Sequence, residues 1–137
     1  MTQFPSPSPA GQDTIAAIAT PPGTAGIAVL RVSGDRAIAV ASELFDGTDL
    51  SEAASHTAHH GYVRDSGGGM LDEVLVTVFR APHSYTGEHS VEISCHGGSV
   101  VSKRVLQRVL DTGVRHAEPG EFTRRAFLNG KMDLSQA

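Results

Sequence analysis

The sequence predicts an α+β fold in which helices pack on a mixed β-sheet. A chain of 137 residues with 39% apolar side chains, 15 Gly and 7 Pro suits one turn-rich globular domain. Apolar residues alternate at strand spacing in several segments and recur at helical spacing in others. The resulting order, β-β-α-β-β-β-α-β, is not a run of repeated βαβ units, and it therefore favours a mixed sheet.

The first two strands are expected at residues 14–20 and 26–33, separated by a Pro-Pro-Gly turn whose prolines cannot donate to a ladder. The second strand is a continuous apolar run, which predicts an inner position covered on both faces. Residues 33–35 (Ser-Gly-Asp) offer helix-capping side chains. Apolar residues at helical spacing then predict a helix over 36–45.

The middle of the chain predicts three further strands. A polar loop over 47–55 leads to a His-rich strand at 56–64, whose polarity favours the edge of the sheet. The Gly-rich segment 65–69 is typical of a hairpin turn, after which residues 73–80 return with three valines on one face. The strand at 89–96 alternates apolar and polar side chains.

The last third predicts helices around one short strand. A helix begins at Ser99, carries an apolar stripe and ends at Gly113, and residues 114–117 form a strand. Another helix is predicted within residues 119–130. Asp133 is suited to cap one more helix, of which only four residues remain, so we expect the chain to be the front part of a longer protein.

The charges are distributed unevenly along the chain. There are 11 Lys and Arg against 15 Asp and Glu, a formal net charge of -4, which argues against a non-specific nucleic-acid binder. Residues 1–98 hold 4 of the basic and 11 of the acidic side chains, whereas residues 99–131 hold 7 basic and 3 acidic ones. An anionic ligand is therefore expected on a surface built by the last third.

Composition excludes several classes of protein. The single cysteine, Cys95, excludes an intrachain disulfide and a cysteine-based zinc site, and it favours a reducing compartment. No segment approaches the roughly 18 uninterrupted apolar residues of a membrane span, and the N-terminus lacks the pattern of a signal peptide. A cytoplasmic location without a membrane is therefore expected.

No phosphate-binding or hydrolase motif is present in the sequence. Gly130-Lys131 resembles the end of a P-loop, but Met132 follows where Ser or Thr is needed, and Arg125 stands where the first Gly should be. A G-x-S-x-G motif is also missing. The chain therefore contains no GTP-binding motif of this type.

Histidine and cysteine offer two weaker alternatives. The seven histidines could suggest a metal site, but no carboxylate motif accompanies them, so polar side chains of an edge strand are favoured. Cys95 and His96 resemble a nucleophile–base pair, yet neighbours on a strand point to opposite faces. Cys95 is therefore expected in the core.

Three features remain as candidates for function. Arg31 is a lone cation in an apolar strand, so it either lies at an edge or needs a carboxylate from the protein or a ligand. The segment 84–88 (Ser-Tyr-Thr-Gly-Glu) combines an aromatic ring, hydroxyls, a flexible Gly and an acid; the alternative is an ordinary surface loop. The segment 119–131 places two phenylalanines among three cations; the alternative is an amphipathic helix with a solvated basic face.

These same features resemble the MnmE (TrmE) family of tRNA-modification GTPases. The matching segments are 21–23 (PPG), 27–34 (IAVLRVSG), 84–88 (SYTGE), 95–98 (CHGG) and 119–134 (PGEFTRRAFLNGKMDL). The resemblance extends from about residue 13 to the end of the chain, and its last motif is long and specific.

The resemblance implies a tetrahydrofolate-binding and dimerisation domain over residues 13–130. The implied fold is similar to the tetrahydrofolate-binding domain of aminomethyltransferase-like proteins. Residues 1–12 would be a flexible Pro/Ser tail, and residues 131–137 would begin a helical domain, which in the family carries the GTPase domain. The implied cofactor is 5-formyl- or 5,10-methylene-tetrahydrofolate, while GTP, Mg²⁺ and K⁺ would bind in the missing domains.

For a full-length protein, the resemblance implies a GTP hydrolase that is a cytoplasmic homodimer. With the FAD-dependent partner MnmG it would form a hetero-oligomer and modify carbon 5 of the wobble uridine of tRNA, in the carboxymethylaminomethyl or aminomethyl form. The present domain would bind and orient the one-carbon carrier, and it would contribute no catalytic residue and no metal ligand.

The family's folate contacts correspond to Arg31, Glu88 and Lys131, and the resemblance implies the same role here. Glu88 can accept the N–H donors of a pterin edge, and the two cations can pair with the carboxylates of the glutamate tail or polarise carbonyl oxygens. Arg125 and Asn129 lie in the same motif as Lys131. They are expected to hold the folate contacts in place without contacting the ligand themselves.

Two other functions remain open at this point. A free-standing folate-dependent aminomethyltransferase would turn over a methylene-folate unaided. A docking module would bind tRNA or a partner protein through the basic last third, without folate and with a steep salt dependence.

Overall fold

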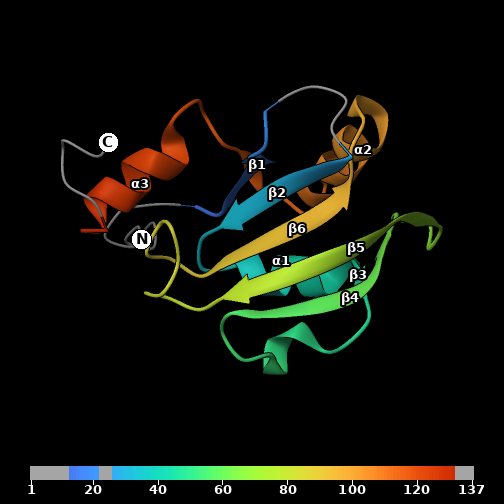
Figure 1. Cartoon of the computed structure of the whole chain (residues 1–137), viewed down its shortest axis with the longest axis horizontal. Helices are drawn as coiled ribbons and strands as arrows, with labels where there is room; N and C mark the ends of the chain where they lie inside the picture. Colours follow the sequence, from blue (N-terminus) through green and yellow to red (C-terminus); the bar gives the residue numbers. More distant parts are fainter. Residues whose placement is uncertain (1–12, 22–25, 132–137) are drawn as a thin grey trace, which may run out of the picture.

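A mixed, seven-stranded sheet organises the fold (Figure 1), which is the α+β class that the sequence predicts. The computed structural model describes residues 13–21 and 26–131. The strands are β1 (Ile15–Ile18), β2 (Ile27–Ser33), β3 (Phe45–Asp46), β4 (Thr57–Arg64), β5 (Met70–Phe79), β6 (Ser90–His96) and β7 (Arg115–His116). The helices are α1 (Ala37–Leu44), α2 (Ser99–Leu110) and α3 (Glu121–Leu128), with a 3-10 turn η1 (Leu50–Glu52).

The strands are ordered β3-β4-β5-β6-β2-β1-β7 across the sheet. Every neighbouring pair is antiparallel except β1 and β7, which run parallel. All six strands expected from the sequence are present. The two-residue β3 was not predicted, because a segment that short has no periodicity of its own; since it pairs only with Tyr62 and Val63, most of β4 lies at the edge, as expected.

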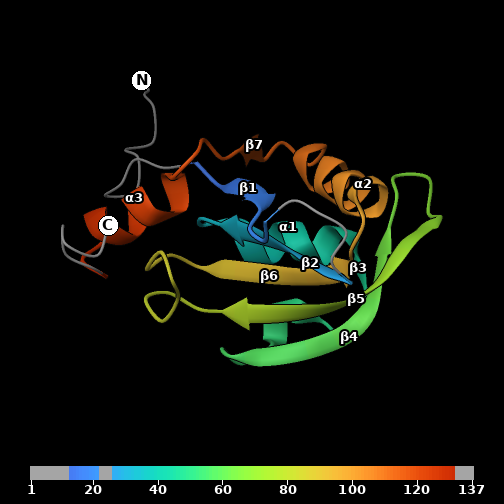
Figure 2. The ribbon, with the colours of Figure 1, turned by 45° about the horizontal axis from the view of Figure 1, so that its top comes forward.

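Helices α1 and α2 cover one face of the sheet, and the core lies between them and the strands (Figures 1 and 2). The strand side chains of this core are Ala16, Ala28, Leu30, Val32, Val63, Val74, Val76, Val78, Val91, Ile93 and Cys95. The stripe predicted for α2 is confirmed, since Val105, Leu106 and Val109 are all buried. Burial of this apolar surface is the main term that stabilises the fold.

The opposite face of the sheet is open over much of its area. The prediction that the second strand is covered on both faces was therefore wrong: Ile27 is 62% exposed, and Leu75 on β5 is 43% exposed. The reason is that α1 and α2 pack on the same side. Helix α3 and the 81–89 loop cover only one end of the open face, away from α2 (Figure 2).

The predicted cap of the first helix was also wrong. Arg36 occupies the N-cap of α1, and no side chain caps that helix. Ser33 is the last residue of β2, and its hydroxyl points to the open face, where it bonds Thr86 and Glu88 instead. The predicted tail at 1–12, most of the Pro-Pro-Gly turn and the cap at Asp133 lie outside the described residues.

Candidate functional site

Arg31 lies on the open face of β2, directly across from Glu92 on β6. Its Nε and Nη2 each donate to Oε2 of Glu92 at 3.1 Å. The guanidinium carbon lies 4.7 Å from the ring centroid of Tyr85 and 5.2 Å from that of Phe122, so two aromatic rings flank the charge. The cation singled out by the sequence thus has a carboxylate from the protein itself, while 19% of its side chain stays exposed.

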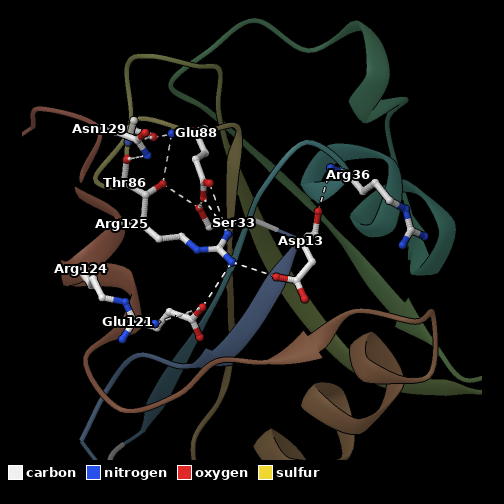
Figure 3. A network of polar contacts seen from close by, with 12 residues as sticks. Asp13, Ser33, Arg36, Thr86, Glu88, Glu121, Arg124, Arg125 and Asn129 are labelled. Carbon is white, nitrogen blue, oxygen red and sulfur yellow. Dashed lines mark hydrogen bonds and ion pairs between the residues drawn. The ribbon is translucent and has the colours of Figure 1, made fainter. Parts of the chain in front are cut away.

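Glu88 is held from two sides at the end of the 84–88 loop (Figure 3). The hydroxyl of Ser33 donates to Oε1 at 2.7 Å, and Nη1 of Arg125 lies 3.2 Å from Oε1 and 3.3 Å from Oε2. Only 11% of the Glu88 side chain is exposed. Its carboxylate therefore has a fixed orientation, with a charge-assisted partner behind it.

Arg125 is completely buried, and three carboxylates surround it (Figure 3). Besides Glu88, its Nη2 donates to Asp13 at 3.2 Å and to Glu121 at 3.3 Å. Its Nε has no hydrogen-bond partner among the described residues. A buried cation of this kind persists only with compensating carboxylates, so α3 and the 84–88 loop are tied together through one side chain.

A second arginine completes this network. Arg115 on β7 donates to Asp13 at 2.7 Å and to Glu121 at 2.7 Å. Burial would raise the pKa of Glu121, but the hydrogen bonds from Arg115 and from the Glu118 backbone outweigh it and lower that pKa to about 2. The hydrogen bonds from Arg115 likewise lower the pKa of Asp13.

Lys131 lies against the 84–88 loop at Gly87. That glycine has φ +85, and a Cβ there would come 3.0 Å from Cβ of Asn129 and 3.2 Å from Cγ of Lys131. Nδ2 of Asn129 donates to the carbonyl of Thr86 at 2.9 Å. Glycine is therefore required both by the backbone conformation and by the close approach of the end of α3.

Two cavities open beside this loop, and we name each after its cation. The Lys131 cavity, of about 430 Å³, is lined by Phe79, Ser84, Tyr85, Ser90, Glu92 and Lys131, among others. The Arg31 cavity, of about 640 Å³, is lined by Ala17, Arg31, Tyr85, His116, Phe122 and Thr123, among others. Both volumes lie within the range typical of small-molecule sites.

Three residues singled out by the sequence, Arg31, Glu88 and Lys131, lie in or against the 84–88 loop. Tyr85 packs on Arg31, Glu88 ends the loop, and Lys131 lies against Gly87. Arg125 on α3 bonds Glu88, and Asn129 at the end of α3 bonds the carbonyl of Thr86.

Sequence reasoning missed several partners of these residues. Glu92 reads as an ordinary polar residue of an alternating strand, and only the pairing of β2 with β6 places it across from Arg31. Asp13 and Arg115 carried no signal, because their partners lie far away in the sequence. For Ser33, the one available hint was that it is a polar residue at the end of an apolar strand.

Two of the histidines pair with carboxylates. His60 pairs with Glu73, and Nδ1 of His96 lies 2.7 Å from Asp72. The part of the chain that the structure describes contains no group of three or more His, Cys, Asp or Glu side chains that could hold a metal ion. Cys95 is buried, as expected, and burial together with the charge of Asp72 raises its thiol pKa to about 11, so a thiolate is disfavoured.

Comparison with known proteins places this sequence in a family. The sequence model described as "GTP-binding protein TrmE N-terminus" matches residues 14–131. A tRNA modification GTPase MnmE of Moorella thermoacetica is 60% identical over 129 residues, which cover 91% of this chain and 28% of that protein. The protein of the same name from Acholeplasma laidlawii is 56% identical over 124 residues, or 90% of this chain and 28% of that protein. The protein of the same name from Salinibacter ruber is 60% identical over 125 residues, which cover 91% of this chain and 27% of that protein.

These relatives are much longer than the present chain, which spans about 28% of their length. The matched segment contains Arg31, Glu88, Lys131, Arg125 and Asn129. None of the helices in the described ranges has the length and apolar character needed to cross a bilayer.

Proposed function

The chain belongs to the family of TrmE N-terminal domains, and on that premise we propose that it binds a tetrahydrofolate one-carbon carrier. The observation that carries the proposal is that Arg31 of β2 and Lys131 beyond α3 both lie against the 84–88 loop, which itself carries Glu88. Two cavities flank that loop and offer space for a small molecule.

The donors and acceptors of this set suit a reduced folate, which carries a pterin edge of N–H donors and a tail of carboxylates. Ser33 and Arg125 both reach Oε1 of Glu88, whereas only Arg125 reaches Oε2. A carboxylate oxygen accepts about two hydrogen bonds, so Oε2 retains capacity for an N–H of the ligand. Arg31 and Lys131 supply the positive charge that carboxylates or carbonyl oxygens require.

Arg125 and Asn129 act as supporting residues in this proposal. Arg125 compensates the charge of Glu88 and fixes its orientation from the buried side. Asn129 holds the backbone of the loop through the carbonyl of Thr86. A bound folate would supply the one-carbon unit, while the residues of this chain bind and orient it, and none of them needs to act as a nucleophile.

We further propose that the full-length protein is a cytoplasmic tRNA-modification GTPase. In this proposal the present domain dimerises, and GTP, Mg²⁺ and K⁺ bind in domains beyond it. The FAD-dependent partner MnmG joins the complex, which modifies carbon 5 of the wobble uridine. The names of the relatives support tRNA modification and GTP hydrolysis for those proteins.

Calorimetric titration of 5-formyl-tetrahydrofolate into the chain, with its mass in solution followed in parallel, tests the proposal. We expect Glu88→Gln to weaken binding by about tenfold or more, since a hydrogen bond to a charged acceptor contributes roughly 1.5–3 kcal/mol. The control is Glu43→Gln, because Glu43 is exposed on α1 and lines neither cavity. Unchanged affinity in Glu88→Gln would refute the role of that carboxylate.

Experiments on the same purified chain distinguish the proposed function from the two alternative functions. Unaided turnover of 5,10-methylene-tetrahydrofolate would indicate an aminomethyltransferase instead. Binding of tRNA with a steep salt dependence, and no binding of folate, would indicate a docking module.

A further inference from the structure

Tyr85 is the one residue, among those described, that lines both the Lys131 cavity and the Arg31 cavity. Beneath it runs the ion pair between Arg31 and Glu92, whose two members lie on different cavities: Arg31 lines the larger and Glu92 the smaller. The boundary that the two cavities share therefore includes the ring of Tyr85, which packs on the guanidinium of Arg31.

The contacts that hold this ring are few. Its side chain is 43% exposed, its face lies on the guanidinium of Arg31, and its hydroxyl is 3.0 Å from Oγ1 of Thr123 on α3. A hydrogen bond in an exposed position competes with water and contributes little. The ring is thus positioned by α3 but is free on the side that faces solvent.

The two cations that are proposed to contact the ligand line different cavities, and Glu88 lines neither of them. Arg31 lies in the larger cavity, and Lys131 and Glu92 lie in the smaller. A compact ligand that fills one cavity contacts only one of the two cations. A ligand that contacts both must be long enough to pass the ring of Tyr85.

We propose that Tyr85 is a specificity-determining residue: one elongated ligand, with a flat head and a carboxylate tail, occupies both cavities and packs on this ring as it crosses. The inference rests on the proposed folate site and deepens it. An aromatic middle section in the ligand would stack on Tyr85, as aromatic rings prefer in offset or edge-to-face contacts. A ligand that carries only the head or only the tail reaches only one of the two cations, and it gains at most part of the contact with this ring.

Three probes test this inference by calorimetry on the chain: 5-formyl-tetrahydrofolate as the whole ligand, a tail-less pterin as the head, and p-aminobenzoyl-glutamate as the tail. We expect Tyr85→Ala to weaken binding of the whole ligand by about tenfold, which corresponds to the upper end of the energy of an aromatic pair. For the pterin and for p-aminobenzoyl-glutamate, Tyr85→Ala should change log Kd by no more than about half of its change for the whole ligand. Tyr85→Phe, which keeps the ring, should bind the whole ligand almost as well as the native chain.

Tyr62→Ala is the matched control, because Tyr62 lies on β4 and lines neither cavity. Its affinity for all three probes should equal that of the native chain. Circular dichroism establishes that each variant is folded before it is titrated.

A second measurement on the native chain avoids the variants altogether. If the cavities are separate, saturation with the pterin leaves the binding of p-aminobenzoyl-glutamate intact. Competition between the two halves would overturn the inference, and so would a Tyr85→Ala variant that binds the whole ligand with native affinity. Failure of the native chain to bind any of the three probes would instead refute the proposed folate site.

Discussion

Replacing Glu121 with Gln should remove a large contribution to stability that depends on pH in the acid range. The side chain of Glu121 is only 3% exposed, and it accepts hydrogen bonds from both Arg115 and Arg125. Gln keeps the size and one acceptor oxygen but leaves the two guanidinium groups without this charge. Because Arg125 is completely buried, water cannot replace the lost partner.

The shift in the pKa of Glu121 sets the size of its contribution to the free energy of unfolding. One pKa unit corresponds to about 1.36 kcal/mol, so a pKa lowered from 4.5 to about 2 makes the ionised carboxylate worth about 3 kcal/mol of folding free energy. The folded pKa lies below the unfolded one, so this contribution is fully present above pH 4.5 and is lost as the pH falls toward 2. Between pH 7 and pH 3 the difference between the native chain and the variant should shrink by roughly 2 kcal/mol.

Urea unfolding followed by far-ultraviolet circular dichroism measures both quantities, since the chain contains no tryptophan. At pH 7 we expect Glu121→Gln to unfold with a free energy about 3 kcal/mol lower than the native chain. Glu118→Gln, an exposed neighbour 3.7 Å from Arg124, should change stability by less than about 0.5 kcal/mol. A Glu121→Gln deficit that is the same at pH 7 and pH 3 would refute the assignment of this pH dependence to Glu121.

Two further predictions concern a thiol and a glycine. Cys95 should react with an aromatic disulfide reagent at pH 7 at least about 100-fold more slowly in the folded chain than in urea. The reason is that Cys95 is buried and its thiol pKa is raised to about 11. Equal reaction rates in the two states would place the thiol at the surface. Gly87→Ala should lower the free energy of unfolding by about 2 kcal/mol or more, from both the left-handed backbone and the contact with Asn129. Gly68→Ala, with φ +92 but open space around it, should cost only about 1 kcal/mol in the same measurement, and equal losses would show that the contact is unimportant.

Local periodicity was sufficient to predict most of the elements. Each predicted strand is present, and the helices near residues 36–45, 99–113 and 119–130 appear with modest changes at their ends. Periodicity does not report which faces of the sheet the helices cover, since that depends on how the chain crosses over. The exposure of Ile27 could therefore not be predicted from an apolar run.

The candidate site was predictable in part, through its motifs. Arg31 was expected either to lie at an edge or to need a carboxylate from the protein or a ligand, and its partner Glu92 is 61 positions away in the sequence. Ser33 was assigned to a helix cap, whereas its hydroxyl bonds Glu88, 55 positions away. In both cases the residue type was informative, and only the register of β2 against its neighbours decided the partner.

The polar network behind the loop is assembled from both ends of the described chain. Arg125 reaches Asp13 across 112 positions and Glu88 across 37, and Arg115 reaches Asp13 across 102. Closing loops of this length costs conformational entropy that single ion pairs cannot offset, so these contacts form only when the sheet and its core have formed. The orientation of Glu88 is consequently a property of the whole fold, and a ligand bound there stabilises the entire domain against unfolding, not the 84–88 loop alone.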